Sequence, residues 1–344
     1  MAHRVPRLLI LSLVLTGCST LGFDGPFKPV IVNASATQNA NGLTSVKRFG
    51  FASCNKQYLP QPLWKKILEE KPELFVWTGD VVYADTRDMG KLSNIYASEL
   101  DQPEYKTFLA SRIPVIGVWD DHDYGENDAD KSYPQKKPSQ QLFLDFIGEP
   151  KDSPRRTQDG IYTRYVLGTG AEAVRFIMLD TRSERTSGEK GDMLGSAQWK
   201  WLENELKSDT GAVTFIISSI QALPTQQKFE KWANIPSSRD RLIKLIDASP
   251  AKNIIILSGD RHFAELSRLK VPSGKTIWEI TASGMTHSFR NPDEFRNKND
   301  LRVGPILDRL NYGLIDFDAQ KKTVRIQAKD LNRKAIIDQT IPLL

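Results

Sequence analysis

Residues 114–128 read PVIGVWDDHDYGEND, and this stretch passes from an apolar run into a crowded acidic loop. The run has the length and composition of a strand that is buried on both faces. Of the eleven residues from Val118 to Asp128, six are acidic residues or histidine. Carboxylates at this density repel one another unless cations lie among them. The stretch therefore predicts an α/β scaffold that holds cations at the end of a strand.

Five other apolar runs end in polar residues in the same way, and helical patterns lie between the runs. The runs are RFGFASC (48–54), LFVWTGD (74–80), VRFIMLD (174–180), VTFIISS (213–219) and NIIILSGD (253–260), and the helical patterns cover 62–70, 94–110, 140–148, 196–207 and 238–249. This alternation predicts a layered α/β protein. The tail from Lys275 onward is richer in strand patterns and favours a second sheet. We expect one domain over residues 46–344, with two packed sheets and helices outside.

The first twenty residues, MAHRVPRLLILSLVLTGCST, have the pattern of a secretory leader. Their apolar run is much shorter than the roughly 20 residues that span a bilayer. The LTGC tetrapeptide that ends at Cys18 resembles a bacterial lipobox, in which the cysteine is lipidated and becomes the first mature residue. We expect a lipoprotein signal peptide over 1–17 and a lipidated tether over 18–45, with an ordinary cleaved signal as the alternative. The expected location is the bacterial cell envelope, and Ser19 favours the outer membrane or periplasm.

The charge balance gives no sign of a nucleic-acid partner. The formal net charge is +5, and removal of Arg4 and Arg7 with the leader would leave +3, which is too weak to indicate nucleic-acid binding. No obligate protein partner is evident from the sequence. Once Cys18 carries lipid, Cys54 is the only thiol left, so an intramolecular disulfide is excluded. Cys54 is then either buried and inert or bound to something.

Metal-ligating residue types follow four of the apolar runs. Ligands of α/β proteins bind outside the carboxyl ends of the strands, so these four segments can converge on one site. Carboxylate and amide oxygens suit hard cations, whereas thiolate, imidazole and phenolate ligands suit a transition metal, so the mixed set predicts two different ions. The oxygen ligands are Asp80, Asp121, Asn127 and Asp260, and the others are Cys54, Tyr83 and His262. Each of these residues alone has an ordinary structural explanation, and only their occurrence at successive strand ends favours a metal site.

The same ordered blocks resemble the alkaline phosphatase D (PhoD-like) family of the metallophosphoesterase superfamily. They are FASC (51–54), GDVVYAD (79–85), WDDHDYGEND (119–128), MLDTR (178–182), LGSAQWKWL (194–202) and LSGDRHFAEL (257–266). The resemblance runs from about Lys47 to beyond Gly284. It implies a four-layer metallophosphoesterase-type sandwich, two mixed β-sheets flanked by helices, with a dinuclear centre at the strand ends. Related enzymes hold ferric iron and calcium there, so we expect Fe³⁺ and Ca²⁺.

The resemblance also implies roles for individual residues. Cys54, Asp80 and Tyr83 match iron ligands, and Asp80 could bridge both ions. Asp260 and His262 match a late ligand block. The asparagine that precedes the superfamily's histidine is Asp121 here, which leaves Asp121 and Asn127 as alternative ligands.

Two more residues of these blocks are expected to act on the substrate. His122 is the candidate to protonate the leaving oxygen, unless it only supports the ligands. Arg182 could bind a phosphate oxygen, although an ion pair with Asp180 or Glu184 is an equal alternative.

We therefore expect an exported, lipid-anchored phosphoester hydrolase that acts on monoesters or diesters. Paired ions can draw a nucleophile from water and clamp the phosphoryl oxygens, which the very slow uncatalysed hydrolysis of phosphate esters demands. Two alternatives keep the same fold: a phospholipase D-like diesterase of the same family, and a non-catalytic lipoprotein that binds metal in the envelope, including one that captures iron or calcium.

Overall fold

The computed structural model describes residues 40–188, 190–208, 211–293 and 296–344. The expected signal peptide, the lipidation site Cys18 and most of the expected tether lie outside the described residues. Within them, no helix combines the length and the apolar character that crossing a bilayer requires.

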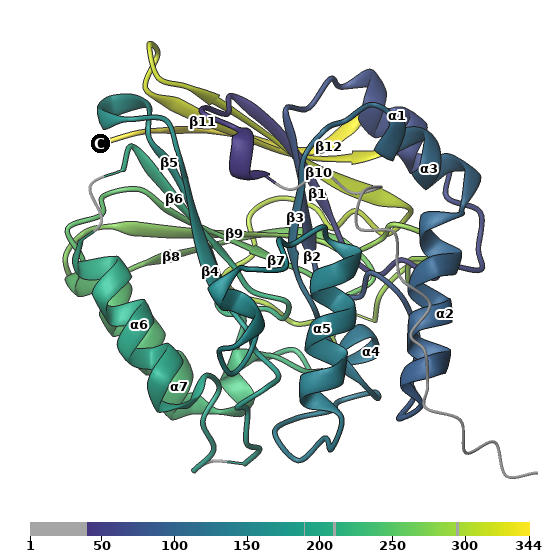
Figure 1. Ribbon diagram of the computed structural model, residues 1–344. Helices are drawn as coiled ribbons and strands as arrows, with labels where there is room; N and C mark the ends of the chain where they lie inside the picture. The colour runs from purple at the N-terminus through teal and green to yellow at the C-terminus, as the bar shows by residue number, and fades with distance from the viewer. Residues whose placement is uncertain (1–39, 189, 209–210, 294–295) are drawn as a thin grey trace, which may run out of the picture.

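Two six-stranded mixed sheets form the centre of the molecule (Figure 1). The first sheet has the strand order β12-β11-β10-β1-β2-β3, in which β1, β2 and β3 are parallel and β10, β11 and β12 are antiparallel. Its strands are β1 (Arg48–Ala52), β2 (Leu74–Thr78), β3 (Val115–Val118), β10 (Asn311–Asp318), β11 (Thr323–Asp330) and β12 (Ala335–Pro342).

The second sheet has the order β4-β5-β6-β7-β9-β8, with four parallel strands between two antiparallel edge strands. Its strands are β4 (Thr163–Leu167), β5 (Val174–Met178), β6 (Val213–Ile217), β7 (Ile254–Ser258), β8 (Ala264–Lys270) and β9 (Thr276–Ala282). The predicted second sheet is confirmed, although the strands of the tail are divided between the two sheets. β9 joins the sheet of the middle segment, while β10 to β12 extend the sheet of β1.

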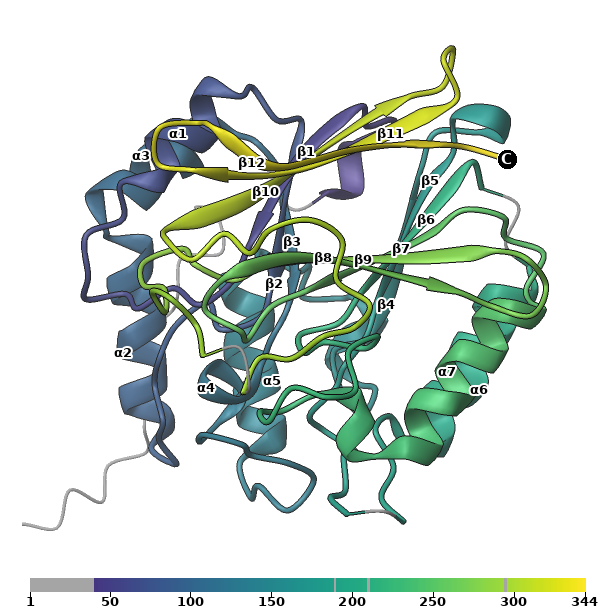
Figure 2. The same ribbon diagram turned by 180° about the vertical axis from the view of Figure 1, so that it is seen from behind.

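The two sheets pack face to face, and helices cover both outer faces (Figures 1 and 2). Between the sheets, the Phe49 ring of β1 contacts Phe176 of β5 and Phe215 of β6 edge-on, with centroids 5.1 and 5.0 Å apart. Alternate residues of β7 point to opposite sides, so Ile255 and Leu257 join the inner core while their neighbours pack under the outer helices. This burial on both faces explains why the strands read as unbroken apolar runs. The predicted four-layer sandwich is confirmed.

Seven α-helices are present in the described residues. They are α1 (Leu63–Glu69), α2 (Met89–Leu100), α3 (Pro103–Ala110), α4 (Asp121–Tyr124), α5 (Lys136–Phe146), α6 (Gly195–Lys207) and α7 (Pro236–Ala248). The single helix predicted over 94–110 is in fact α2 and α3, because Pro103 cannot continue a helix but suits the first turn of a new one.

Candidate metal centre

Four of the predicted ligands lie directly after strands in the left-handed backbone conformation. The φ angles of Cys54, Asp80, Asp260 and His262 are 62°, 51°, 67° and 55°. Residues other than glycine seldom adopt this conformation, which costs of order 1–3 kcal/mol each and is concentrated at functional sites. The strand ends are therefore bent sharply where the predicted ligands stand.

The glycines before Asp80 and Asp260 allow the strand ends to approach one another. A Cβ atom on Gly79, whose φ is +96°, would lie 2.6 Å from Asp120 Cβ. A Cβ atom on Gly259 would lie 2.5 Å from Ser53 Oγ and 2.6 Å from the Thr78 carbonyl oxygen. A larger residue at Gly79 would push apart the neighbouring ends of β2 and β3, and one at Gly259 would push the two sheets apart, so the glycine of each GD pair has a packing role.

The first group of ligand atoms is Cys54 Sγ, an Asp80 carboxylate oxygen and a His262 ring nitrogen, all within 4.8 Å of one another. The Cys54 thiol donates to Asp80 Oδ2 at 3.4 Å. Tyr83 completes the group, because its hydroxyl donates to Asp80 Oδ2 at 3.2 Å and lies 3.0 Å from His262 Nε2. The structure thus brings together four of the five residues that the resemblance matched to an iron site or its late ligand block, and Asp260 lies outside the group.

The second group consists of Asp80, Asp121 and His122, whose ligand atoms also lie within 4.8 Å of one another. Asp80 belongs to both groups, which is the placement expected of a bridging carboxylate. His122 packs against the Tyr83 ring, with centroids 4.1 Å apart.

Three predicted residues lie outside these groups. Asp260 and Asn127 line the adjacent cleft, where Asn127 is exposed and donates to Asp128 Oδ2 at 2.9 Å. Arg182 is fully buried, and its Nε donates to Asp120 Oδ1 at 2.7 Å while Nη2 contacts Glu230. Arg182 therefore makes an ion-pair network with carboxylates other than the expected Asp180 or Glu184 side chains.

Two neighbours of the site had no predicted role in it. Asp85 Oδ1 lies 2.7 Å from His122 Nδ1, although nothing in the sequence spacing pairs them. His287 places its Nε2 atom 3.2 Å from His262 Nε2 and 3.4 Å from the Tyr83 hydroxyl. The only sign in the sequence was that residue 287 is a histidine. Because it is far along the chain from most of the other ligands, its position beside them could not be predicted.

Burial dominates the electrostatics of the site. Burial, followed by Asp121 and Asp120, raises the pKa of Asp80 well above its usual value, and burial followed by Asp120 does the same to the pKa of Asp260. Burial also lowers the pKa of His262 to about 2. Burial favours the neutral form of His122, but the Asp85 hydrogen bond and the charges of Asp80 and Asp121 outweigh it and raise the pKa of His122 to about 10. At this site, the negative charge of the buried carboxylates would thus exceed the positive charge of the neighbouring side chains.

The residues present fit a pair of metal ions. Asp80 Oδ1 and Asp121 Oδ1 are buried and have no hydrogen-bond partner among the described residues, although Arg182 Nη2 lies 3.9 Å from Asp121 Oδ1. Such carboxylate oxygens are costly to bury unless a cation contacts them. The thiol, phenol and imidazole of the first group suit a transition metal, whereas the second group is richer in carboxylates.

A cleft of about 630 Å³ opens beside the second group. Its lining includes Asp121, His122 and His262 together with Arg261, whose guanidinium lies 4.3 Å from the centroid of the Phe229 ring. The cleft thus offers a substrate direct access to the ligand groups, whereas the Arg261 side chain is buried and its Nη2 donates to Asn297 Oδ1 at 2.5 Å.

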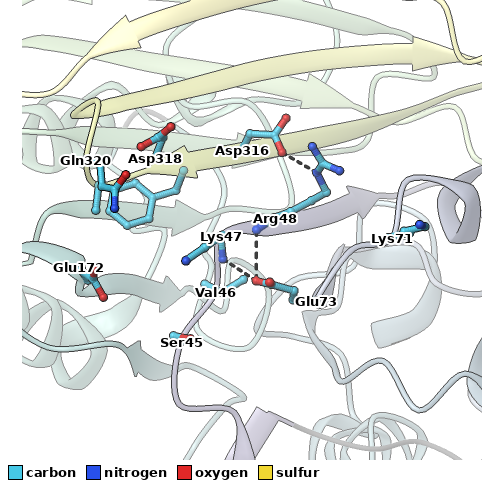
Figure 3. A pocket seen from close by; sticks show the side chains of 12 residues that line it. Ser45, Val46, Lys47, Arg48, Lys71, Glu73, Glu172, Asp316, Asp318 and Gln320 are labelled. Atoms are coloured by element: carbon cyan, nitrogen blue, oxygen red, sulfur yellow. Dashed lines mark hydrogen bonds and ion pairs between the residues drawn. The ribbon is translucent and has the colours of Figure 1, made fainter.

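Another cavity, of about 530 Å³, lies at the opposite end of β1 (Figure 3). Its charged side chains have both signs, and Arg48 pairs with Asp316 at 2.5 Å while the Lys47 backbone N–H donates to Glu73 at 2.6 Å. Its described lining has no cysteine or histidine. The candidate site is therefore the cleft at the strand ends.

Comparison with known proteins gives consistent results. The model of the family described as PhoD-like phosphatase matches residues 49–327. The chain is 24% identical to alkaline phosphatase D of Bacillus subtilis, over 67% of this chain and 48% of that protein, so it spans about half the length of that relative.

Three solved structures share the fold. The structure of PhoD has a TM-score of 0.70 at 19% identity and covers 88% of this chain and 70% of that one. GAP50, the anchor in the inner membrane complex of Plasmodium, has a TM-score of 0.58 at 11% identity and covers 87% and 90%. A dimetal phosphatase from Danio rerio has a TM-score of 0.57 at 12% identity and covers 87% and 100%. At these identities the likeness concerns the fold alone.

Proposed function

Because the chain belongs to the PhoD-like phosphatase family, we propose that it is a metal-dependent phosphoester hydrolase with a dinuclear centre. The observation that carries this proposal is the pair of ligand groups that share Asp80 beside an open cleft. The likeness to a protein named alkaline phosphatase D supports the same reaction class.

The two ions would have different ligands. Cys54, Asp80, Tyr83 and His262 would hold Fe³⁺, because thiolate, phenolate and imidazole suit a transition metal. Asp80 and Asp121 would hold Ca²⁺, a cation that prefers oxygen ligands.

Asp260 and Asn127 are further candidate ligands of the calcium ion. Asp260 can add a carboxylate from the cleft wall. The burial of Asp121 within the second ligand group supports it over the exposed Asn127 as a ligand.

The chain's own residues supply the proton and the orientation for the reaction. A dinuclear centre provides a nucleophile from water and stabilises charge on the phosphoryl oxygens. His122 donates a proton to the leaving oxygen, and Asp85 fixes the ring by its contact with Nδ1, so that Nε2 carries the transferred proton. The exposed cleft admits the ester.

The experiment is hydrolysis of a nitrophenyl phosphomonoester and of the matching bis-nitrophenyl diester by the chain from Ser19 onward, supplied with iron and calcium. Turnover that disappears in Asp80→Ala establishes the hydrolase, and the preferred ester separates phosphatase from phosphodiesterase or phospholipase D-like activity. Bound metal without turnover of either ester would instead support a binding protein.

We further propose that the protein is exported and anchored in the bacterial envelope by lipid on Cys18. The LTGC tetrapeptide supports this proposal. Cys18→Ala should prevent lipidation, and mass spectrometry of the mature N-terminus should show the loss of the acyl mass. An unmodified wild-type cysteine would contradict the proposal.

A further inference from the structure

We propose that His287 is an additional ligand of the ion that Cys54, Asp80, Tyr83 and His262 hold, an inference that rests on the metal centre proposed above. His287 Nε2 lies 3.2 Å from His262 Nε2 and 3.4 Å from the Tyr83 hydroxyl. Two imidazole nitrogens and a phenol oxygen therefore meet at one place, beside Asp80.

The separations of these atoms match those of ligand atoms around one ion. Ligands at about 2.1 Å from a metal lie about 3 Å apart when they are at right angles to one another. The neighbouring pairs in this group are Tyr83 Oη to His262 Nε2 at 3.0 Å, Tyr83 Oη to Asp80 Oδ2 at 3.2 Å, His262 Nε2 to His287 Nε2 at 3.2 Å and Cys54 Sγ to Asp80 Oδ2 at 3.4 Å. His287 extends this series as another corner of the same shell.

Hydrogen bonding alone explains the arrangement poorly. The Tyr83 hydroxyl can donate its proton to Asp80 Oδ2 and accept from His262 Nε2 and His287 Nε2, but both imidazoles would then carry hydrogens on nitrogens that lie 3.2 Å apart. One proton can satisfy one acceptor, and each neutral imidazole has a single N–H to share between its two nitrogens. A cation among these atoms removes the conflict, because all of them can then act as electron-pair donors.

The backbone holds His287 between the two loops that carry the other ligands. The Met285 and Thr286 amides donate to the carbonyls of Ser53 and Cys54 at 3.1 and 3.4 Å. On the other side, the Phe289 amide and the Ser288 hydroxyl donate to the His262 carbonyl at 2.9 and 2.7 Å. The loop that contains His287 is thus fastened to both the Cys54 turn and the His262 turn.

A second imidazole would make the two metal sites chemically more distinct. Nitrogen ligands favour transition metals over calcium, whereas the group of Asp80 and Asp121 is richer in carboxylates. His287 would therefore help to direct iron and calcium to different positions.

The test uses the full-length chain in detergent, loaded with iron and calcium, and compares His287→Gln and His287→Ala with wild type. Iron per chain is measured by elemental analysis, iron affinity by competition with a chelator, and the Tyr83–iron contact by its visible charge-transfer absorption. We expect iron affinity to fall at least about 10-fold and the absorption band to shift. His287→Glu, which restores a ligand atom, should recover part of the affinity.

Arg290→Ala is the matched control, because Arg290 is exposed on the same loop and lines, together with His287, a surface pocket other than the candidate cleft. It should leave the iron content and the absorption band unchanged. The circular dichroism of each metal-free variant shows whether the fold is intact. If wild type binds iron and a folded His287→Gln binds it equally tightly with an unchanged band, the inference is overturned. If wild type binds no iron, the metal centre proposed above fails as well.

Discussion

His122 Nδ1 lies 2.7 Å from Asp85 Oδ1, and this contact orients the ring that stacks on Tyr83. If His122 protonates the leaving oxygen, Asp85→Asn should slow the hydrolysis of alkyl esters by about 10- to 100-fold. Nitrophenyl esters should be affected much less, because nitrophenolate leaves without protonation. The measurement is kcat for the two ester types.

Asp101→Asn is the control for this comparison. The Asp101 side chain is exposed, and within the described part of the chain its ion-pair partner is the surface residue Lys106. An equal loss for both ester types in Asp85→Asn would show that Asp85 supports the fold of the site rather than proton transfer.

Asp80 belongs to both ligand groups, and its replacement should affect both ions. We expect Asp80→Asn to lose iron and calcium and to reduce kcat by about 10²-fold or more, whereas Asp121→Asn should retain iron. Elemental analysis of both variants distinguishes the shared ligand from the unshared one. Retention of iron at the wild-type level in Asp80→Asn would contradict the ligand assignment.

The same replacement should have the opposite effect on the metal-free protein. Asp121 and Asp120 add to burial in raising the pKa of Asp80, so removal of its charge relieves repulsion. Metal-free Asp80→Asn should be more stable by at least about 1 kcal/mol, seen as a rise of the metal-free Tm by a few degrees. A lower Tm than that of metal-free wild type would show that the neighbouring carboxylates are not in conflict.

Among the described residues, Arg182 is the only cation that forms an ion pair with the Asp120 side chain, and both groups are fully buried. Arg182→Ala should reduce the free energy of unfolding by about 3–5 kcal/mol, because it leaves buried carboxylates unpaired. Thermal or denaturant unfolding measures this loss. A stable Arg182→Ala variant with a raised KM alone would instead restore the predicted role of Arg182 in substrate binding.

Glu70 gives the fold a stability that depends on pH. Burial raises the pKa of Glu70, but hydrogen bonds from Arg333, Lys329 and Tyr312 outweigh it and lower the pKa to about 2. The folded-state pKa lies below the unfolded value of 4.5, so the contribution is complete above pH 4.5 and is lost as pH falls towards 2. Glu70→Gln should cost roughly 1.5–3 kcal/mol at pH 7.

Urea unfolding of wild type and Glu70→Gln at several pH values checks this contribution. The difference between the two proteins should shrink as pH falls from 5 towards 3. A difference that is constant over this range would show that Glu70 does not act through its charge.

The scaffold and the residue types at the strand ends could be predicted from the sequence alone. Residues buried on both faces of a sheet must be apolar throughout, so β1, β2, β3, β5, β6 and β7 could be recognised as runs, and the polar residues after them marked one edge. The predicted residues Cys54, Asp80, Tyr83, Asp121, His122 and His262 are brought together because that edge is shared.

The contacts between residues that are distant along the chain depend on tertiary packing and could not be predicted. His287 is 204 residues from Tyr83, and its contact with that residue depends on how the loop after β9 is fastened between two turns. Arg182 had a residue type that suited phosphate, but packing buried it against Asp120 and Glu230. Local sequence specifies strand, turn and ligand type, whereas the direction and partners of a side chain depend on the packing of all elements around it.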